Sequence, residues 1–442
     1  MKLTIREKIG FGSGDMAIAI VMMSMQLIVA YFYTDVFGLK ATDVGFLLLT
    51  VRILDAVIDP LIGMITDKSK SRWGRYRPWL LLFSIPFGVA ITLMFITPDF
   101  NYLGKLLWAY ATYIFLTVAY TFIAIPYISL IGVITDNSQE RLSANTYRFV
   151  MTKVAMFLVS IIVPVAAVKL GNGNLASGYQ LSMGIMGILG TLLCLYCFFS
   201  VKERITHDPS NISFFRQCKS LFKNDQWVIL GIVIFLIMLG GSVRSAVAAY
   251  YAKYYLNGGD DLIPYFLTTG VVASILSMIV AGYMVRRINK LTMFRVSQAA
   301  TFLFSLLMFL LVERETVVLA FTLYFIITFL ADMQLPVYWA SIAEAVDYGE
   351  VKNHERVSGL AFGGILFFQK LGMGFAGGMV GFILSYASYT PDAIQPESSL
   401  LAITLMMTVI PGLFHLLVSA VMRKFIIDDA YYADLRLKLV RE

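Results

Sequence analysis

Charged side chains are scarce in this chain of 442 residues, because Asp, Glu, Lys and Arg together make up only 14% of it. Hydrophobic residues make up 59%. A soluble domain carries about 25% charged residues and about 45–50% apolar ones. Since so few charges cannot cover a water-facing surface, the composition excludes a soluble protein and predicts a polytopic integral membrane protein.

Cysteine and histidine are also scarce, with three residues of each type. Cys194 and Cys197 have the spacing of a redox pair, but they lie inside an apolar segment, which disfavours redox chemistry. The histidines His207, His354 and His415 form no metal-binding spacing, and no GxxxxGK[ST] phosphate loop occurs. We therefore expect no enzyme activity, no cofactor and no use of ATP.

Long apolar runs replace the missing charges. A spanning helix needs about twenty mostly apolar residues, whereas a strand of a membrane barrel alternates apolar and polar residues over about ten. The runs are of the first kind and predict an all-α polytopic membrane protein. The twelve expected transmembrane helices are at 10–34, 42–66, 78–98, 103–133, 145–169, 178–200, 226–256, 262–286, 293–312, 317–347, 357–388 and 399–425.

Positive charges gather on one side of these spans. Of the 35 Lys and Arg residues, 25 lie at the N-terminus, in alternate loops and in the C-terminal tail, and five lie in the opposite loops. By the positive-inside rule both termini are cytoplasmic, and the first helix is expected to stay uncleaved. The net charge of +7 is thereby explained by topology, so we expect no nucleic-acid partner.

The longest polar segment divides the spans into six plus six, and each half has a short basic turn after its second span. Paired halves of this kind are typical of transporters that bind their cargo near the membrane midplane. We expect an N-terminal half at 1–200, a central cytoplasmic loop at 201–225, a C-terminal half at 226–426 and a cytoplasmic tail at 427–442.

Two carboxylates lie in the middle of the second span, within Arg52-Ile-Leu-Asp55-Ala-Val-Ile-Asp59-Pro60. Residues four apart share one helical face, so Asp55 and Asp59 point the same way. In a low dielectric they repel each other unless a bound Na⁺ or a shared proton joins them. Arg52 offers a structural partner for one carboxylate but not for both. The pattern therefore predicts a cation site at Asp55 and Asp59.

Other ionisable residues at membrane depth mark substrate sites or structural pairs, because an unpaired charge is costly there. Arg244 and Asp332 either neutralise each other or contact a substrate. Glu344 and Asp347 lie at the cytoplasmic end of span ten, where solvation or gating is favoured over substrate contact. The full set at this depth is Asp15, Arg148, Arg244, Asp332, Glu344 and Lys370.

Aromatic residues, among them Tyr120 and Trp339, accompany these charges. Aromatic faces beside hydrogen-bonding groups suit a sugar ring, although packing is the commoner role of any single one of them.

Six segments together resemble the glycoside–pentoside–hexuronide:cation symporter family, a branch of the major facilitator superfamily, over essentially the whole chain. The resemblance implies the major facilitator fold and uptake of sugars or glycosides with Na⁺, H⁺ or Li⁺ by alternating access. It implies a monomer in the bacterial inner membrane, with a sugar, a coupling cation and the lipid bilayer as partners. The segments are Gly10-Phe-Gly-Ser-Gly-Asp15, Tyr33-Thr-Asp35-Val-Phe-Gly38, Arg52 to Pro60, Ser71-Arg-Trp-Gly-Arg-Tyr-Arg-Pro78, Ile125-Pro-Tyr127 and Val346-Asp-Tyr-Gly-Glu350.

The resemblance also implies roles for individual residues. Asp55 and Asp59 match the cation site, with Thr121 as a candidate hydroxyl ligand. Asp15 and Arg148 match sugar-binding positions, and Lys370 matches a lysine between the two sites. The expected substrate site is Asp15, Tyr120, Arg148, Arg244, Trp339 and Lys370. The residues expected to act in gating are Asp67, Arg72, Arg75 and Asp347.

Two positions depart from the melibiose-type pattern of this family. Ile58 stands where an asparagine is found, so one amide oxygen is missing beside the carboxylates. An alkali cation needs several oxygen ligands and a proton needs one, which shifts the expectation from Na⁺ toward H⁺. Ala124 stands where a sugar-binding aspartate is found, so the cavity is richer in positive charge.

The charge of the sugar is left open by these residues. With Asp15 against Arg148 and Lys370, the expected cavity is net positive, which suits an anionic sugar such as a hexuronide or a sulfonated sugar. Alternatively, Lys370 bridges to the second-span carboxylates and Arg148 pairs with Asp15, which suits an uncharged glycoside. A lysolipid transporter is the other substrate class, because lysolipid carriers share this fold, but the midplane charges disfavour it.

Overall fold

The computed structural model describes residues 2–69, 71–135, 138–204, 214–285, 287–353 and 359–441. All regular elements in these ranges are helical, and no β-strand occurs within them. The chain divides into two compact units. Unit 1 consists of Met1–Pro209, Gly258–Thr268 and Leu384–Ile394, and unit 2 of Ser210–Asn257, Thr269–Ile383 and Gln395–Glu442.

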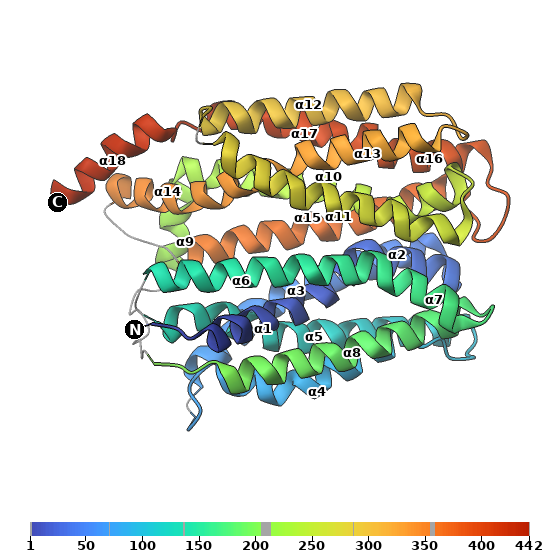
Figure 1. The fold of residues 1–442 in the computed structure, drawn as a ribbon, viewed down its shortest axis with the longest axis horizontal. Helices are drawn as coiled ribbons and strands as arrows, with labels where there is room; N and C mark the ends of the chain where they lie inside the picture. The colour runs from blue at the N-terminus through green and yellow to red at the C-terminus, as the bar shows by residue number, and fades with distance from the viewer. Residues whose placement is uncertain are drawn as a thin grey trace. The chain divides into compact units, whose positions relative to one another are not determined.

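Unit 1 contains the helices of the first six expected spans (Figure 1). Helix α1 packs against α6 and α8, α4 packs against α5 and α8, and α3 packs against α5. Its helices are α1 (Ile5–Leu27), α2 (Val29–Tyr31), the π-helix η1 (Phe32–Val36), α3 (Ala41–Lys68), α4 (Arg77–Met94), α5 (Tyr102–Ile134), α6 (Ser138–Phe157), the π-helix η2 (Leu158–Ile162), α7 (Val163–Gly171) and α8 (Leu175–Ser200).

Unit 2 is built around α10 and α12, which both pack against α17. Two further helices, α11 (Gly259–Met284) and α15 (Gly359–Tyr386), contribute to both units. The other helices of unit 2 are α9 (Phe214–Lys223), α10 (Asp225–Tyr250), the π-helix η3 (Tyr251–Tyr255), α12 (Lys290–Leu311), α13 (Val317–Asp332), α14 (Leu335–Asn353), α16 (Glu397–Met407), α17 (Val409–Val421), the 3₁₀ helix η4 (Met422–Lys424) and α18 (Asp429–Arg441).

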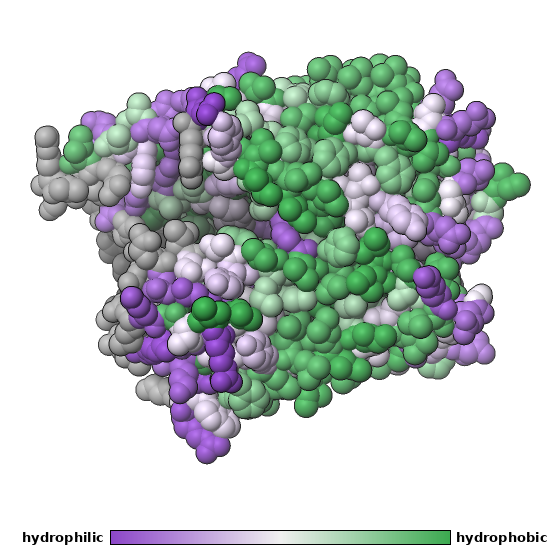
Figure 2. Space-filling view, in the orientation of Figure 1, coloured by the Kyte–Doolittle hydropathy of each residue, from purple (hydrophilic) through white to green (hydrophobic). Residues whose placement is uncertain are grey.

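The lengths and surfaces of these helices fit a membrane. Eleven segments of the described chain are long and apolar enough to cross it, and α3, with 28 residues, lies at the position of the expected second span. Figure 2 shows apolar side chains along the middle of the helices and hydrophilic ones at their ends. Leu82, Ile85 and Leu310 are each more than 60% exposed, as lipid-facing residues are. The prediction of an all-α polytopic membrane protein is confirmed, with eleven candidate spans found among the described residues where twelve were expected.

The start of α1 is fixed by short polar contacts. Thr4 and Glu7 form a capping box, in which the Glu7 N–H donates to the Thr4 hydroxyl and the Thr4 N–H donates to the Glu7 carboxylate. Lys8 lies 2.9 Å from Glu140 of α6, and its hydrogen bond lowers the pKa of that carboxyl group. These contacts hold the first turn of α1 on α6.

Glycines let α1 approach its neighbours closely. A Cβ atom on Gly12 would lie 2.8 Å from the sulfur of Met151 on α6, and one on Gly14 would lie 2.5 Å from the ring of Tyr127 on α5. No real Cβ fits at such distances, so the glycines of the Gly10–Asp15 motif are required for packing. This close approach is what places Asp15 beside α6.

Glu203, in the segment after α8, caps the N-terminus of α4. Its carboxylate accepts backbone N–H groups from Arg75 at 2.8 Å, Tyr76 at 2.7 Å and Arg77 at 2.8 Å. Gly74, at φ 111°, turns the backbone around the carboxylate, where a side chain would collide with it. A negative charge is favourable at this position because the first N–H groups of a helix have no partner within the helix.

We predict that Glu203→Gln lowers the thermal unfolding midpoint of the detergent-solubilised protein, because the amide keeps one acceptor oxygen and loses the charge. The expected loss is about 1–2 kcal/mol in the free energy of unfolding. The control, Lys202→Gln, removes the exposed charge next to it and leaves the cap intact. Equal shifts of the midpoint in the two variants would contradict the capping role.

Candidate functional site

Asp55 is held from two sides in the middle of α3 and is 1% exposed. The Thr121 hydroxyl of α5 donates to its Oδ1 at 3.1 Å, and Arg52 Nη1 lies 3.4 Å from its Oδ2. The same hydroxyl lies 3.0 Å from the carbonyl oxygen of Thr117, one turn back on α5. Because a hydroxyl has one hydrogen, Thr121 has two competing acceptors.

Asp59 follows one turn later on α3, where it is partly buried. Together Arg52, Asp55, Asp59 and Thr121 form what we call the α3 cluster. Tyr120 of α5 lies within electrostatic reach of both carboxylates of this cluster and also of Asp15. The structure therefore brings the expected cation residues together within unit 1.

Asp15 of α1 and Arg148 of α6 form an ion pair, with 3.0 Å between Oδ2 and Nε. Thr152, one turn after Arg148, donates its hydroxyl to the same carboxylate oxygen at 2.5 Å. The guanidinium group also lies 5.9 Å from the centroid of the Tyr127 ring, which is favourable for a cation. We call Asp15, Arg148 and Thr152 the α1–α6 cluster. Its formal charge is zero.

The pairing leaves much of Arg148 for other contacts. The ion pair joins the ε nitrogen, whereas four of the five guanidinium hydrogens are on the two η nitrogens. The Arg148 side chain is 25% exposed. A group that is neutralised and still accessible can donate hydrogen bonds to hydroxyl groups of a ligand.

The residues expected to act in gating lie at helix ends. Arg75 gives its backbone N–H to the Glu203 cap, and the guanidinium of Arg72 lies 4.3 Å from the centroid of the Trp73 ring. Asp67 is on α3, but its side chain lies outside the described residues. Asp347 of α14 accepts the hydroxyl of Tyr432 of α18 at 2.7 Å.

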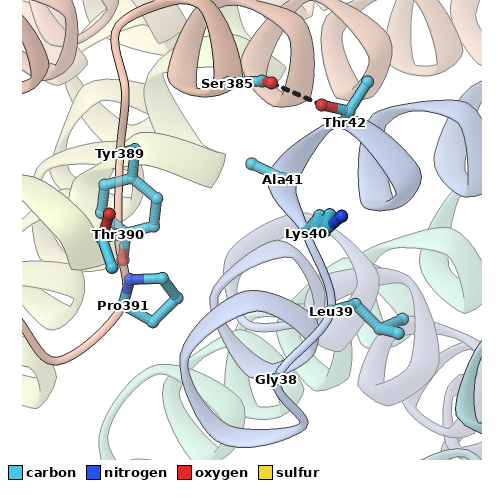
Figure 3. A pocket seen from close by; sticks show the side chains of 9 residues that line it. All are labelled: Gly38, Leu39, Lys40, Ala41, Thr42, Ser385, Tyr389, Thr390 and Pro391. Atoms are coloured by element: carbon cyan, nitrogen blue, oxygen red, sulfur yellow. Dashed lines mark hydrogen bonds between the residues drawn. The ribbon is translucent and has the colours of Figure 1, made fainter. Parts of the chain in front are cut away.

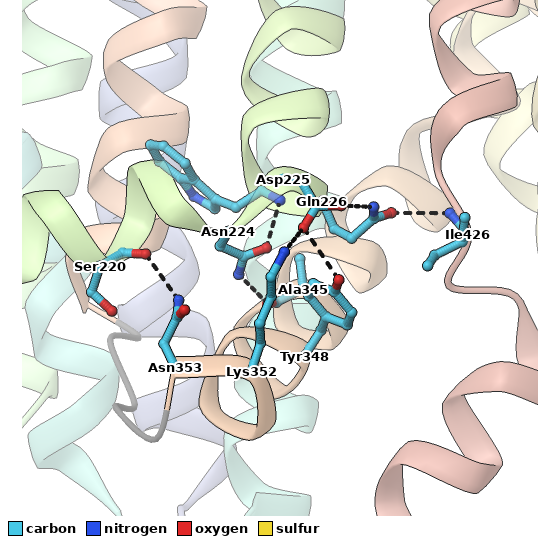
Figure 4. Close-up of polar contacts among 10 residues, drawn as sticks. Ser220, Asn224, Asp225, Gln226, Ala345, Tyr348, Lys352, Asn353 and Ile426 are labelled. Carbon is cyan, nitrogen blue, oxygen red and sulfur yellow. Dashed lines mark hydrogen bonds and ion pairs between the residues drawn. The ribbon is translucent and has the colours of Figure 1, made fainter.

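Near Asp347, the start of α10 is tied to the end of α14 (Figure 4). Asn224 donates its side-chain amide to a carbonyl oxygen of α14 at 2.7 Å, and Asp225 accepts from Lys352 and from Tyr348 at 3.2 Å. A Cβ on Gly349 would lie 2.5 Å from the Asn224 amide nitrogen. The Val346–Glu350 motif therefore supplies a polar contact and a close approach within unit 2.

Hydrogen bonds also join α2, η1 and the start of α3 to the two short segments that unit 1 takes from the second half of the sequence. The pairs are Tyr31 with Asp260 at 2.6 Å, Tyr389 with Asp35 at 2.7 Å, and Thr42 with Ser385. Figure 3 shows a cavity of about 330 Å³ beside the last pair, lined by 38–42 and 389–391. All three contacts are hydrogen bonds between hydroxyl or carboxylate groups.

Arg244 of α10 is 4% exposed and has two hydrogen-bond acceptors. It donates to the carbonyl oxygen of Met407 at 3.1 Å and to the hydroxyl of Ser305 at 3.0 Å. Asp332 lies within electrostatic reach of the guanidinium group. Pairing of Arg244 with Asp332 and contact of Arg244 with a substrate both stay predictions.

The other two expected substrate residues of unit 2 lie on different helices. Trp339 of α14 is 39% exposed and packs edge-on against Tyr338, with 6.0 Å between ring centroids. Lys370 of α15 is partly buried. Their assignment to the substrate site stays a prediction.

Comparison with known proteins identifies the family. Residues 10–429 match the family described as MFS/sugar transport protein. The chain is 33% identical to the inner membrane symporter YicJ of Escherichia coli (strain K12), over 96% of this chain and 92% of that protein. It is 30% identical to the isoprimeverose transporter of Lactiplantibacillus pentosus, over 90% of this chain and 83% of that protein. The chain belongs to the glycoside–pentoside–hexuronide:cation symporter family.

A solved structure supports the fold of this symporter family member. The crystal structure of a D-xylose-proton symporter is similar with a TM-score of 0.71 at 13% sequence identity, over 96% of this chain and 98% of that one. At that identity the likeness concerns the fold alone. The prediction of the major facilitator fold is confirmed, and the chain is a multi-pass membrane transporter.

Several contacts of this symporter were missed by reasoning from the sequence. Thr152 follows Arg148 by four residues and so shares its helical face, which is a usable signal. Glu203 and the Ser305 contact of Arg244 carried no such signal. His415 is isolated in the sequence, but its Nδ1 lies 2.6 Å from the side-chain oxygen of Gln298.

Among the described residues, no group of three or more His, Cys, Asp or Glu side chains could hold a metal ion. The assignment of the oxygen atoms of Asp55, Asp59 and Thr121 as ligands of a coupling cation stays a prediction.

We predict that Thr152→Val weakens sugar binding by about three- to tenfold, the equivalent of one lost hydrogen bond to a charged group. The substitution keeps the shape of the side chain but removes the hydroxyl that holds Asp15 against Arg148. Isothermal titration with the transported sugar measures the change.

The matched control is Thr404→Val, which removes a buried hydroxyl that donates only to the carbonyl oxygen of Leu400 on its own helix. An unchanged dissociation constant in Thr152→Val, or an equal change in both variants, would contradict the role of the α1–α6 cluster.

Proposed function

We propose that this symporter carries a neutral sugar or glycoside with one monovalent cation across the inner membrane by alternating access. The observation that carries the proposal is the presence of two adjacent charged clusters in unit 1. With both carboxylates ionised, the α3 cluster has a net charge of −1, and the α1–α6 cluster has a net charge of zero. Tyr120 lies within electrostatic reach of carboxylates in both clusters, so a charge change in one is felt near the other.

The α1–α6 cluster supports an uncharged substrate. Arg148 is neutralised by Asp15, so an anionic sugar would have to compete with that carboxylate for the guanidinium. The accessible η nitrogens and the carboxylate instead offer donors and acceptors that match the hydroxyl groups of a glycoside. This supports the neutral reading of the cavity over the hexuronide or sulfonated-sugar reading.

The α3 cluster supports a proton as the coupling ion. When Asp55 is ionised, the Thr121 hydroxyl donates to it at 3.1 Å. When Asp55 is protonated, it can donate to Thr121, whose hydrogen then turns to the Thr117 carbonyl oxygen at 3.0 Å. Asp55 and Thr121 therefore keep a hydrogen bond to each other in both states without movement of a helix. Ile58 contributes no oxygen, which disfavours Na⁺ further.

Alternating access requires polar contacts that form and break at both ends of the spans. The Arg72–Arg75 turn and Asp347 are candidates at one end, which we place in the cytoplasm with both termini. The Asp35–Tyr389 and Tyr31–Asp260 pairs are candidates at the other. Each is a small set of hydrogen bonds, which a conformational change can exchange for water.

We predict that Asp55→Asn and Asp59→Asn each abolish concentrative uptake, because either change removes a charge that the cation must compensate. Exchange of sugar between the two sides should persist, since the sugar contacts lie on other helices. Uptake and exchange in membrane vesicles measure the two processes separately.

The control is Asp43→Asn, which removes a carboxylate from the first turn of the same helix. Wild-type accumulation in both test variants would overturn the assignment of the cation site, and so would equal losses in the control.

We predict that a pH gradient drives uptake in the absence of Na⁺, because the α3 cluster can exchange a proton with its hydrogen bonds preserved. Right-side-out vesicles in Na⁺-free buffer, with the inside alkaline, are the test. Transport that stays silent until Na⁺ is added would show that the proton is not the coupling ion.

A further inference from the structure

Two spans of unit 2 are broken, and each break frees a backbone carbonyl oxygen. Pro411, in the first turn of α17, lacks the N–H that would bond to Met407. The turn at Met333 and Gln334 separates α13 from α14, and Pro336, in the first turn of α14, lacks the N–H that would bond to Asp332, the residue after Ala331. Free carbonyl groups at membrane depth need partners from neighbouring helices.

Arg244 supplies the partner at the first break. Its Nε donates to the Met407 carbonyl oxygen at 3.1 Å, and its Nη2 donates to Ser305 of α12 at 3.0 Å. One guanidinium thus joins α10, α12 and the break of span twelve. A lysine has one nitrogen and cannot reproduce this fork.

Gln298 supplies the partner at the second break. Its side-chain N–H donates to the Ala331 carbonyl oxygen at 3.1 Å, so its oxygen is left as an acceptor. His415 Nδ1, 2.6 Å from that oxygen, is therefore the protonated ring nitrogen. Gln298 is fully buried and His415 is 2% exposed. The hydrogen bonds run in one direction, from His415 through Gln298 to the break of span ten.

Both connections meet on α12. Gln298 and Ser305 are seven residues apart, so they share one face of that helix. Gly412 of α17 packs against this face, since a Cβ there would lie 2.9 Å from Ser305 Cβ. α12 and α17 are therefore in direct contact at Gly412 and Ser305.

We propose that Arg244, Gln298, Ser305 and His415, which we call the unit 2 joint, are positioning residues for transport. They hold the breaks of spans ten and twelve on α12, so the two spans move together when unit 2 changes conformation. Asp332, the last residue of α13, lies at the break that Gln298 holds. In this account Arg244 acts on the helix breaks and makes no contact with sugar or cation.

The unit 2 joint requires a hydrogen-bond donor at position 415, because the Gln298 side-chain oxygen can only accept. An apolar cluster of the same size would pack α12 against α17 equally well, but it would remove the side-chain donors to the Met407 and Ala331 carbonyl oxygens. A residue at position 415 must therefore donate where Nδ1 does. Asparagine does so with its side-chain nitrogen, and leucine does not.

The test compares His415→Leu with His415→Asn in proteoliposomes. This inference rests on the proposed transport of a sugar, so wild-type counterflow is measured first and reports on that function alone. We expect His415→Leu to slow counterflow at saturating sugar by about tenfold, while the sugar dissociation constant stays within about twofold. We expect His415→Asn to recover at least about half of the rate.

Three results would overturn the joint: wild-type rates in His415→Leu, a changed sugar dissociation constant with an unchanged rate, or no recovery in His415→Asn. A second measurement covers the case in which His415→Leu fails to fold. Gln298→Leu and His415→Asn, alone and combined, should be non-additive in rate, because both act through one hydrogen-bonded path. Additive effects would contradict the proposal.

Discussion

A charge inside the hydrocarbon region is costly unless another group of the protein compensates it, and this constraint organises the described structure. Asp15 meets Arg148 and Thr152, and Asp55 meets Arg52 and Thr121. Each partner comes from the same helix or a neighbouring one within unit 1. The two clusters differ in net charge. The α3 cluster is negative and suits a cation, whereas the α1–α6 cluster is neutral and suits an uncharged ligand.

The same constraint applies to the backbone. Membrane helices are broken only where other groups take over the freed hydrogen bonds. In unit 2 an arginine, a glutamine and a serine donate to carbonyl oxygens at or near such breaks: Arg244 to Met407, Gln298 to Ala331, and Ser277 to Phe329 at 2.6 Å. These three buried side chains thus have backbone partners within the protein, without a ligand. Arg244 is an example, because its position within a transmembrane span suggested either a charged partner or contact with a substrate.

The fold and much of the α3 cluster could be predicted from the sequence, because apolar run length and the four-residue spacing of Asp55 and Asp59 are local signals. The pairing of Asp15 with Arg148 was one of two open alternatives, since it depends on the approach that Gly12 and Gly14 permit. Gln298 and His415 are 117 residues apart, and no local pattern joins them. The identity of the cation and of the glycoside depends on contacts between residues that are far apart in the sequence, so no local pattern predicts it.

Counterflow with the purified chain in proteoliposomes tests the central claim most directly. Vesicles preloaded with a neutral glycoside should take up the labelled glycoside saturably, and the uronic or sulfonated counterpart should compete poorly. Because no ion gradient is present, the result depends on the sugar site alone. Strong competition by the anionic sugar would contradict the neutral α1–α6 cluster as the recognition site. Counterflow of a lysolipid with none of any sugar would contradict the account as a whole.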